Sequence, residues 1–366
     1  MPQHSRSYTL PVDLSALDGL CTLNISYRSN IATEWADAGY EVGFEQVMLE
    51  SAAMTAAIDV CPEKKALILS EDAKFIKVVD GDHTYTVDKI HGLICAVSGQ
   101  GKELITTPIT PNIWRAPTDN DRNLKNKWFE AGYDFMTLKC YSCELVSAND
   151  DEVVVAASIS MGTPKLQPAL KLQITYRFLR GAGVQFDFAV EVREDLPMLP
   201  RFGVEFNMPK DCEYLKYFGK GPYESYADKR NASKLGVYST SVTEHFEPYV
   251  RPQENMAHDG SRWVEIYNNA GNGLLATNTE ESDSFSFNCS HYTPMMLTNV
   301  PHDFELEPLE ETVVNIDYRH NGIGSNSCGP WLRERWQFKD KSFCFSFRLA
   351  PVFINDTDPF EKIFKK

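Results

Sequence analysis

Two carboxylates at a short spacing, Glu224 and Asp228, could carry out acid–base chemistry in this chain. They lie in a stretch of aromatic and charged residues, 217–230, that contains two glycines. Aromatic rings stack on the C–H faces of sugars, and carboxylates accept hydrogen bonds from sugar hydroxyls. A carboxylate pair could also cleave a glycoside. Because the chain has 51 acidic residues, close pairs arise by chance, and we assign no catalysis to this one.

Arg115 is a second residue of interest, in a loop rich in Asx residues and proline at 112–122. A guanidinium group can pair with a carboxylate through two parallel hydrogen bonds. We predict that Arg115 is buried and held by Asp119 or Asp121, so that the pair pins the loop. A loop that lines a sugar cleft is the alternative.

A glycine-rich loop is predicted after a strand at 315–330. Glycine permits tight turns or a close approach of the backbone to a ligand. The spacing does not match a phosphate-binding loop. A plain surface loop fits the composition equally well.

Cysteine and histidine spacing predicts no metal site. Cys140 and Cys143 have CxxC spacing, without a second such pair or paired histidines. Residues three apart on a strand point to opposite faces, so we interpret these as two ordinary cysteines. The eight histidines form no HExxH or comparable pattern.

Period-two alternation of apolar and polar residues dominates the chain. Alternation on both sides of a turn at 180–183 predicts an antiparallel hairpin over 170–192. Helical patterns are confined to 123–131 and 227–233. Strands without interleaved helices predict an all-β fold of sandwiched sheets. Further strands are predicted at 23–27, 43–49, 74–79, 84–88, 153–159, 263–267, 273–277, 284–288, 311–318 and 342–349.

The overall charge and the cysteines narrow the class of protein. With 51 acidic and 36 basic residues the formal charge is −15, which argues against nucleic acid or anionic membranes as partners. No apolar run approaches the ~18 residues of a membrane span, and the first residues contain no apolar signal segment. Nine cysteines in no regular framework predict reduced thiols and a cytoplasmic location.

Four segments, in this order, resemble signatures of the last domain of the β-galactosidases of glycoside hydrolase family 2. They are WRAPTDND at 114–121, GPYESYADKR at 221–230, YVRPQEN with GSR at 249–255 and 260–262, and HNGIG at 320–324. Residues 30–40 resemble the end of the immunoglobulin-like domain that precedes it. The resemblance covers essentially the whole chain.

The resemblance implies an all-β fold with a partial immunoglobulin-like β-sandwich at 1–62. A linker at 63–70, a large β-supersandwich of the galactose mutarotase type at 71–358 and a tail at 359–366 follow. The family's two catalytic glutamates lie in a central barrel, and neither of their sequence contexts occurs here. Retaining hydrolysis needs an acid and a nucleophilic carboxylate. We therefore expect a non-catalytic C-terminal part or small subunit of a β-galactosidase, inactive alone.

The resemblance also implies roles for single residues. In some members a tryptophan of the final glycine loop contacts the sugar; here Cys328 stands at the matching place and Trp331 lies close by. The predicted pocket wall comprises His320, Asn321, Cys328 and Trp331. A structural loop network is expected from Arg115, Asp119, Asn120, Asp121, Glu224, Asp228, Arg230, Glu254 and Arg262. No cofactor is expected in this chain, because the Mg and Na ions common in complete family enzymes are bound outside this region.

The expected partners are the barrel-bearing part of a β-galactosidase and galactosides. We also predict self-association through 1–62, because an incomplete sandwich would leave apolar residues facing water; these are Tyr27, Trp35, Phe44 and Val47. Two alternatives remain open. One is a stand-alone carbohydrate-binding β domain, and the other is a mutarotase-type aldose epimerase, in which His302 or His320 would face a glutamate across a cleft.

Overall fold

The computed structural model describes residues 5–11, 13, 21–49, 65–163, 167–279 and 282–353. The chain divides into two compact units, one N-terminal and one formed by the main body of the chain. The predicted tail at 359–366 and the first two residues of the predicted linker, 63 and 64, lie outside the described residues.

The N-terminal unit contains a two-stranded antiparallel hairpin, β1 (Cys21–Arg28) and β2 (Glu41–Leu49). Tyr27, Trp35 and Val47 are exposed on it, whereas Phe44 is half-buried. The described part of this unit therefore has fewer strands than the roughly seven of an immunoglobulin-like sandwich. Self-association through this unit stays a prediction.

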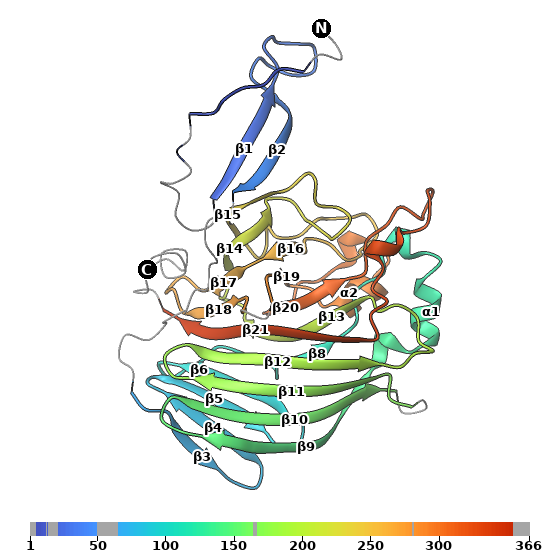
Figure 1. Cartoon of the computed structure of the whole chain (residues 1–366). Coiled ribbons are helices and arrows are strands. Elements are labelled where there is room, and N and C mark those ends of the chain that lie inside the picture. Colours follow the sequence, from blue (N-terminus) through green and yellow to red (C-terminus); the bar gives the residue numbers. More distant parts are fainter. Residues whose placement is uncertain are drawn as a thin grey trace. The chain divides into compact units, whose positions relative to one another are not determined.

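The main unit consists of three sheets in which every ladder is antiparallel. The largest has nine strands in the order β15-β14-β17-β18-β21-β12-β11-β10-β9 (Figure 1). These strands are β9 (Thr137–Ala148), β10 (Glu152–Gly162), β11 (Leu170–Leu179), β12 (Gly183–Val192), β14 (Tyr214–Gly221), β15 (Lys234–Ser241), β17 (Trp263–Tyr267), β18 (Gly273–Thr277) and β21 (Ser342–Val352).

Two five-stranded sheets complete the unit. One has the order β3-β4-β5-β6-β7, formed by β3 (Ile68–Glu71), β4 (Phe75–Asp80), β5 (His83–Asp88), β6 (Leu93–Gly99) and β7 (Lys102–Glu103). The other has the order β16-β19-β20-β13-β8, formed by β16 (His258–Ser261), β19 (Phe285–Ser290), β20 (Glu311–His320), β13 (Arg201–Pro209) and β8 (Thr110–Asn112).

The apolar core lies between the large sheet and the two smaller ones. Tyr85 of β5 contacts Phe178 of β11, with ring centroids 5.5 Å apart. Phe202 of β13 packs edge-on against Phe188 of β12 and Phe343 of β21, at 5.9 and 5.0 Å. Both five-stranded sheets thus pack on the same nine-stranded sheet, which confirms the predicted all-β sandwich architecture.

Most elements follow the sequence patterns. The predicted hairpin is β11–β12, paired from Leu170–Val192 to Leu179–Gly183. The predicted helix at 123–131 is confirmed as the shorter α1 (Lys125–Glu130). The predicted linker is too long by its last residues, because 68–70 belong to β3, where Ile68 and Leu69 pair with Val79 and Val78 of β4.

One helix prediction is wrong, and one helix was missed. Residues 227–233 form turns instead of a helix, because Tyr226 and Lys229 exchange backbone hydrogen bonds in a tight loop. Helix α2 (Pro294–Asn299) was not predicted, although its start has a recognisable signal. The Thr293 hydroxyl accepts a hydrogen bond from the Met296 amide (3.1 Å), and proline occupies the first helical position. The 3₁₀ turns are η2 (Asp119–Asp121), η3 (Tyr133–Phe135), η4 (Asp303–Glu305) and η5 (Glu334–Trp336).

The CxxC pair lies on one face of β9, contrary to the expectation of opposite faces. Pairing with β10 jumps from Ser142–Ser158 to Cys140–Ile159, so Tyr141 is an extra residue that shifts the alternation. Burial raises the pKa of both thiols, that of Cys143 to about 12. Both are therefore protonated at neutral pH, which agrees with ordinary, unreactive cysteines.

Candidate functional site

The four motif segments meet in one set of loops, which we call the loop cluster (residues 114–122, 221–232, 247–256 and 320–331). The Asn120 side chain donates to the Gly324 carbonyl at 2.6 Å and accepts from the Ser327 amide at 3.2 Å. The Asp119 amide donates to the Gln253 side chain at 3.1 Å. Segments more than 100 residues apart in the sequence are thus hydrogen-bonded to one another.

Arg115 is the buried anchor of the first segment. Its side chain is fully buried, and Nη2 donates to both oxygens of Asp121 at 3.0 Å. The same carboxylate accepts from the amide and hydroxyl of Thr118 at 2.8 and 3.0 Å. Of the two carboxylates considered from the sequence, Asp121 therefore holds Arg115, whereas Asp119 is exposed.

Asp228 shapes the glycine loop. Its two carboxylate oxygens accept hydrogen bonds from the amides of Ile323 and Gly324 at 2.9 and 2.7 Å. A side chain at position 322 would lie 3.0 Å from this carboxylate and 2.8 Å from Leu332. A larger residue at position 322 would therefore have to displace the Leu332 side chain or the Asp228 carboxylate, which holds the loop through the two amides.

The other carboxylate of the motif, Glu224, is also occupied. It accepts from the Tyr249 hydroxyl at 2.6 Å, from the Met256 amide at 3.0 Å and from the Lys229 ammonium group. Since Glu224 and Asp228 both bind groups of the loop cluster, they serve as structural acceptors in this arrangement. Arg230 pairs with Asp259 at 3.3 Å, and the backbone amide of Arg262 donates to Phe218 at 2.8 Å.

A second buried network was missed from the sequence. Arg201 of β13, 1% exposed, donates through Nε to Asp317 of β20 at 3.0 Å, and through Nη2 to its second oxygen. His320 Nε2 lies 3.1 Å from the same carboxylate, and Glu254 lies 3.9 Å from Arg201. The available signal was the presence of charged residues within two strands whose alternate positions are apolar, β13 and β20.

Glu205, also on β13, belongs to this network. Its carboxylate accepts from the Asn112 amide group at 3.1 Å. Burial raises its pKa to about 7, and the charge of Arg201 only partly offsets this effect. The proton on Glu205 therefore limits the negative charge held around Arg201.

The predicted pocket-wall residues divide into two groups. His320 and Asn321 are 4% and 0% exposed, and the Asn321 side chain accepts from the Phe338 amide at 3.0 Å, so both face the interior. Cys328 is exposed, and Trp331 is 44% exposed. Sugar contact by any of the four stays a prediction.

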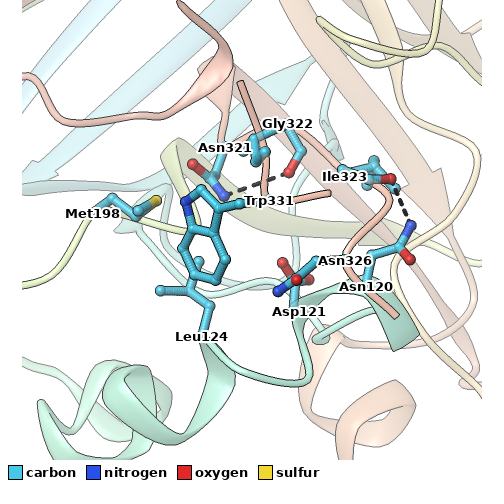
Figure 2. A pocket seen from close by; sticks show the side chains of 11 residues that line it. Asn120, Asp121, Leu124, Met198, Asn321, Gly322, Ile323, Asn326 and Trp331 are labelled. Carbon is cyan, nitrogen blue, oxygen red and sulfur yellow. Dashed lines mark hydrogen bonds between the residues drawn. The ribbon is translucent and has the colours of Figure 1, made fainter. Parts of the chain in front are cut away.

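Trp331 borders a small pocket beside the glycine loop. Figure 2 shows its ring near Leu124 and Met198, with Asn321 and Asn120 on the loop side. The pocket measures about 20 Å³, room for little more than one water molecule. Trp331 also lines a larger hollow of about 520 Å³, together with Lys127 and Arg193. Sugar binding at either place stays a prediction.

Two other chemistries find no support in the described residues. No group of three or more His, Cys, Asp and Glu side chains is placed there to hold a metal ion. His302 contacts Glu305 three residues along the surface, at 2.5 Å, and His320 contacts Asp317 in the interior. Neither histidine is paired with a glutamate across a cleft, as an epimerase would require.

Family comparison identifies the class of protein. Residues 80–349 match the model described as β-galactosidase small chain, and residues 1–50 match β-galactosidase domain 4. The chain belongs to the β-galactosidase small-chain family.

Curated relatives include the β-galactosidases of Actinobacillus pleuropneumoniae and Staphylococcus xylosus. The first is 36% identical over 94% of this chain and 33% of its own length. The second is 35% identical over 94% and 35%. The chain thus spans about one third of these relatives. Among solved structures, the GalM/aldose epimerase homologue of C. elegans aligns over 78% of this chain and 99% of its own, at 8% identity and a TM-score of 0.40, too distant to bear on function.

Replacing Arg115 should destabilise the protein strongly. Arg115→Ala leaves the buried Asp121 carboxylate without its cation, and we expect a loss of about 3–5 kcal/mol in the free energy of unfolding. Urea denaturation measures this. The control is Arg177→Ala, which breaks a half-exposed pair and should cost at most about 1 kcal/mol. Equal losses in the two variants would contradict a buried anchor at Arg115.

Glu205 should make stability depend on pH. The folded protein keeps this proton up to about pH 7, whereas the unfolded chain releases it near 4.5. The contribution of Glu205 is therefore fully present below pH 4.5 and is lost as the pH rises through 7. Glu205→Gln cannot ionise, so its stability relative to wild type should increase from pH 5 to pH 8, by on the order of 2–3 kcal/mol.

The test for Glu205 is urea denaturation across this pH range. Glu103→Gln, at an exposed position, is the control and should leave the difference from wild type unchanged with pH. A constant difference for Glu205→Gln as well would show that the folded carboxyl titrates like that of the unfolded chain.

Proposed function

We propose that the chain is the non-catalytic last part of a β-galactosidase. It supplies one wall of the sugar pocket and the contacts to a barrel-bearing part, which hydrolyses terminal β-D-galactosides such as lactose. The observation that carries this proposal is the small-chain match over residues 80–349 in a chain that spans about one third of its relatives.

The geometry of the carboxylates supports the non-catalytic role. A glycosidase needs one carboxyl group that can protonate the leaving oxygen and a second that can attack the sugar or activate water. Glu224 receives three donors and Asp228 receives two backbone amides. Both carboxylates therefore accept hydrogen bonds within the loop cluster, and the family's catalytic contexts do not occur in the sequence.

The glycine loop supports the role as a pocket wall. Its start is anchored by buried His320 and Asn321, and its turn is held by Asp228. Cys328 and Trp331 follow on the exposed side. A loop that is held by hydrogen bonds and presents Trp331 at the rim of an open hollow of about 520 Å³ suits a pocket that another part of the enzyme completes.

We also propose a cellular location for the protein. All eight cysteines in the described residues are free thiols, as in a reducing environment. No helix among those residues has the length and apolar character to cross a membrane. We place the protein in the cytoplasm on the strength of its thiols.

A complementation assay tests the function. The 366-residue chain alone should not hydrolyse a chromogenic β-galactoside. Mixed with the Actinobacillus pleuropneumoniae relative from which the matching third has been removed, it should restore activity. Glu224→Gln serves as a control for hidden catalysis in this chain. Turnover by the chain alone that disappears in Glu224→Gln would refute the proposal, and so would a mixture without any gain in activity.

A further inference from the structure

Three large apolar side chains project into solvent from the loop cluster and the adjoining turn η4. Tyr223, Val250 and Phe304 are 68%, 77% and 81% exposed. Val250 and Phe304 lie on neighbouring segments, because the Asp303 amide donates to the Val250 carbonyl at 3.1 Å. We call these three residues, together with the hollow beside Tyr223 described next, the projecting face.

The hollow has a volume of about 440 Å³. Tyr223 and Tyr249 line it, together with Glu224, Glu247, Lys229 and Arg230. Lys229 and Arg230 are half-exposed, with 52% and 43% of their side chains accessible. The projecting face thus combines exposed apolar side chains, a hollow of about 440 Å³ and a charged rim, a combination that protein–protein interfaces share.

The backbone behind the face is held firmly. The Glu254 amide donates to Ala116 at 3.3 Å, and the Glu247 amide donates to the Asn255 side chain at 3.1 Å. The Tyr249 hydroxyl is bound to Glu224, and Met256 is held at a φ of +53° with its amide on the same carboxylate. A preorganised surface loses little conformational entropy when a partner binds. Single exposed apolar residues need no explanation, but a rigid group of this kind does.

We propose that the projecting face docks the remaining part of the β-galactosidase, the part that this chain does not contain. This inference rests on the proposed function. About two thirds of the length of the relatives lies outside the match, so a large protein surface is available to cover it. The face is built on the segments that also hold the glycine loop, through Asp228 and Asn120. Docking there would bring the partner beside the loop that forms the pocket wall.

The test uses the complementation pair with charges placed in the face. Val250→Asp/Phe304→Asp should bind the truncated relative at least about 100-fold more weakly than the unmodified chain, with a matching loss of restored activity at limiting concentration. Titration of activity and analytical ultracentrifugation measure the two effects. The control is Ile90→Asp/Val146→Asp, which charges two apolar residues of similar exposure, 61% and 62%, outside the face. It should behave like the unmodified chain.

The possible results of this test distinguish a failure of the docking face from a failure of the proposed function. Thermal melting of each variant alone establishes that it is folded. If the unmodified chain restores no activity, the proposed function fails and the docking face fails with it. If the unmodified chain restores activity and folded Val250→Asp/Phe304→Asp does so equally well, only the docking face is wrong. Self-association that this variant abolishes, with complementation intact, would assign the face to a second copy and overturn the proposal.

Discussion

The ion pair between Arg201 and Asp317 is the interaction on which the arrangement of the candidate site depends. It joins β13 to β20 in the interior, where neither charge is stable alone. The two strands slip by one residue here, so that Gly203 lies opposite Asp317. A side chain at position 203 would collide with the Asp317 carboxylate and the backbone of β20. The glycine, the slip in register and the ion pair therefore depend on one another.

Each member of this ion pair also contacts a residue of the candidate site. Asp317 also binds His320, the last residue of β20, and thereby sets where the strand ends and the glycine loop begins. Arg201 reaches toward Glu254, whose amide is bound to the segment that contains Arg115. Asp317, Glu254 and Glu205 all lie around Arg201. Because three carboxylates outnumber one guanidinium, the proton kept by Glu205 reduces the repulsion among them.

The hydrogen bonds of the carboxylates in the loop cluster differ from those that an active site requires. Catalytic carboxyl groups need an oxygen that can reach the substrate. In the loop cluster, Asp121, Glu224 and Asp228 instead direct their oxygens at amides, hydroxyls and cations of the same chain. Their hydrogen bonds hold the loops in place, and the exposed residues of the loop cluster include both apolar side chains, such as Val250, and charged ones, such as Arg251. The loop cluster is therefore held together by internal hydrogen bonds, which agrees with the membership of the chain in the small-chain family.

The sequence by itself determined the elements and one local contact. Alternation within a strand depends on near neighbours, and so the β11–β12 hairpin could be predicted residue by residue. Arg115 and Asp121 are six residues apart, and the loop between them is short enough for the pair to be anticipated. Local patterns failed where one inserted residue or one tight turn overrode them, as at Tyr141 in β9 and at 227–233.

Only the tertiary structure decided which distant groups meet. Asp228 and Ile323 are 95 residues apart, and Arg201 and Asp317 are 116 apart. Nothing in either segment indicates its partner, because strand order and sheet packing bring them together. The same packing turned His320 and Asn321 inward and left Val250 and Phe304 in solvent. Burial is a property of the assembled sheets and loops, whereas periodicity is a property of a few adjacent residues.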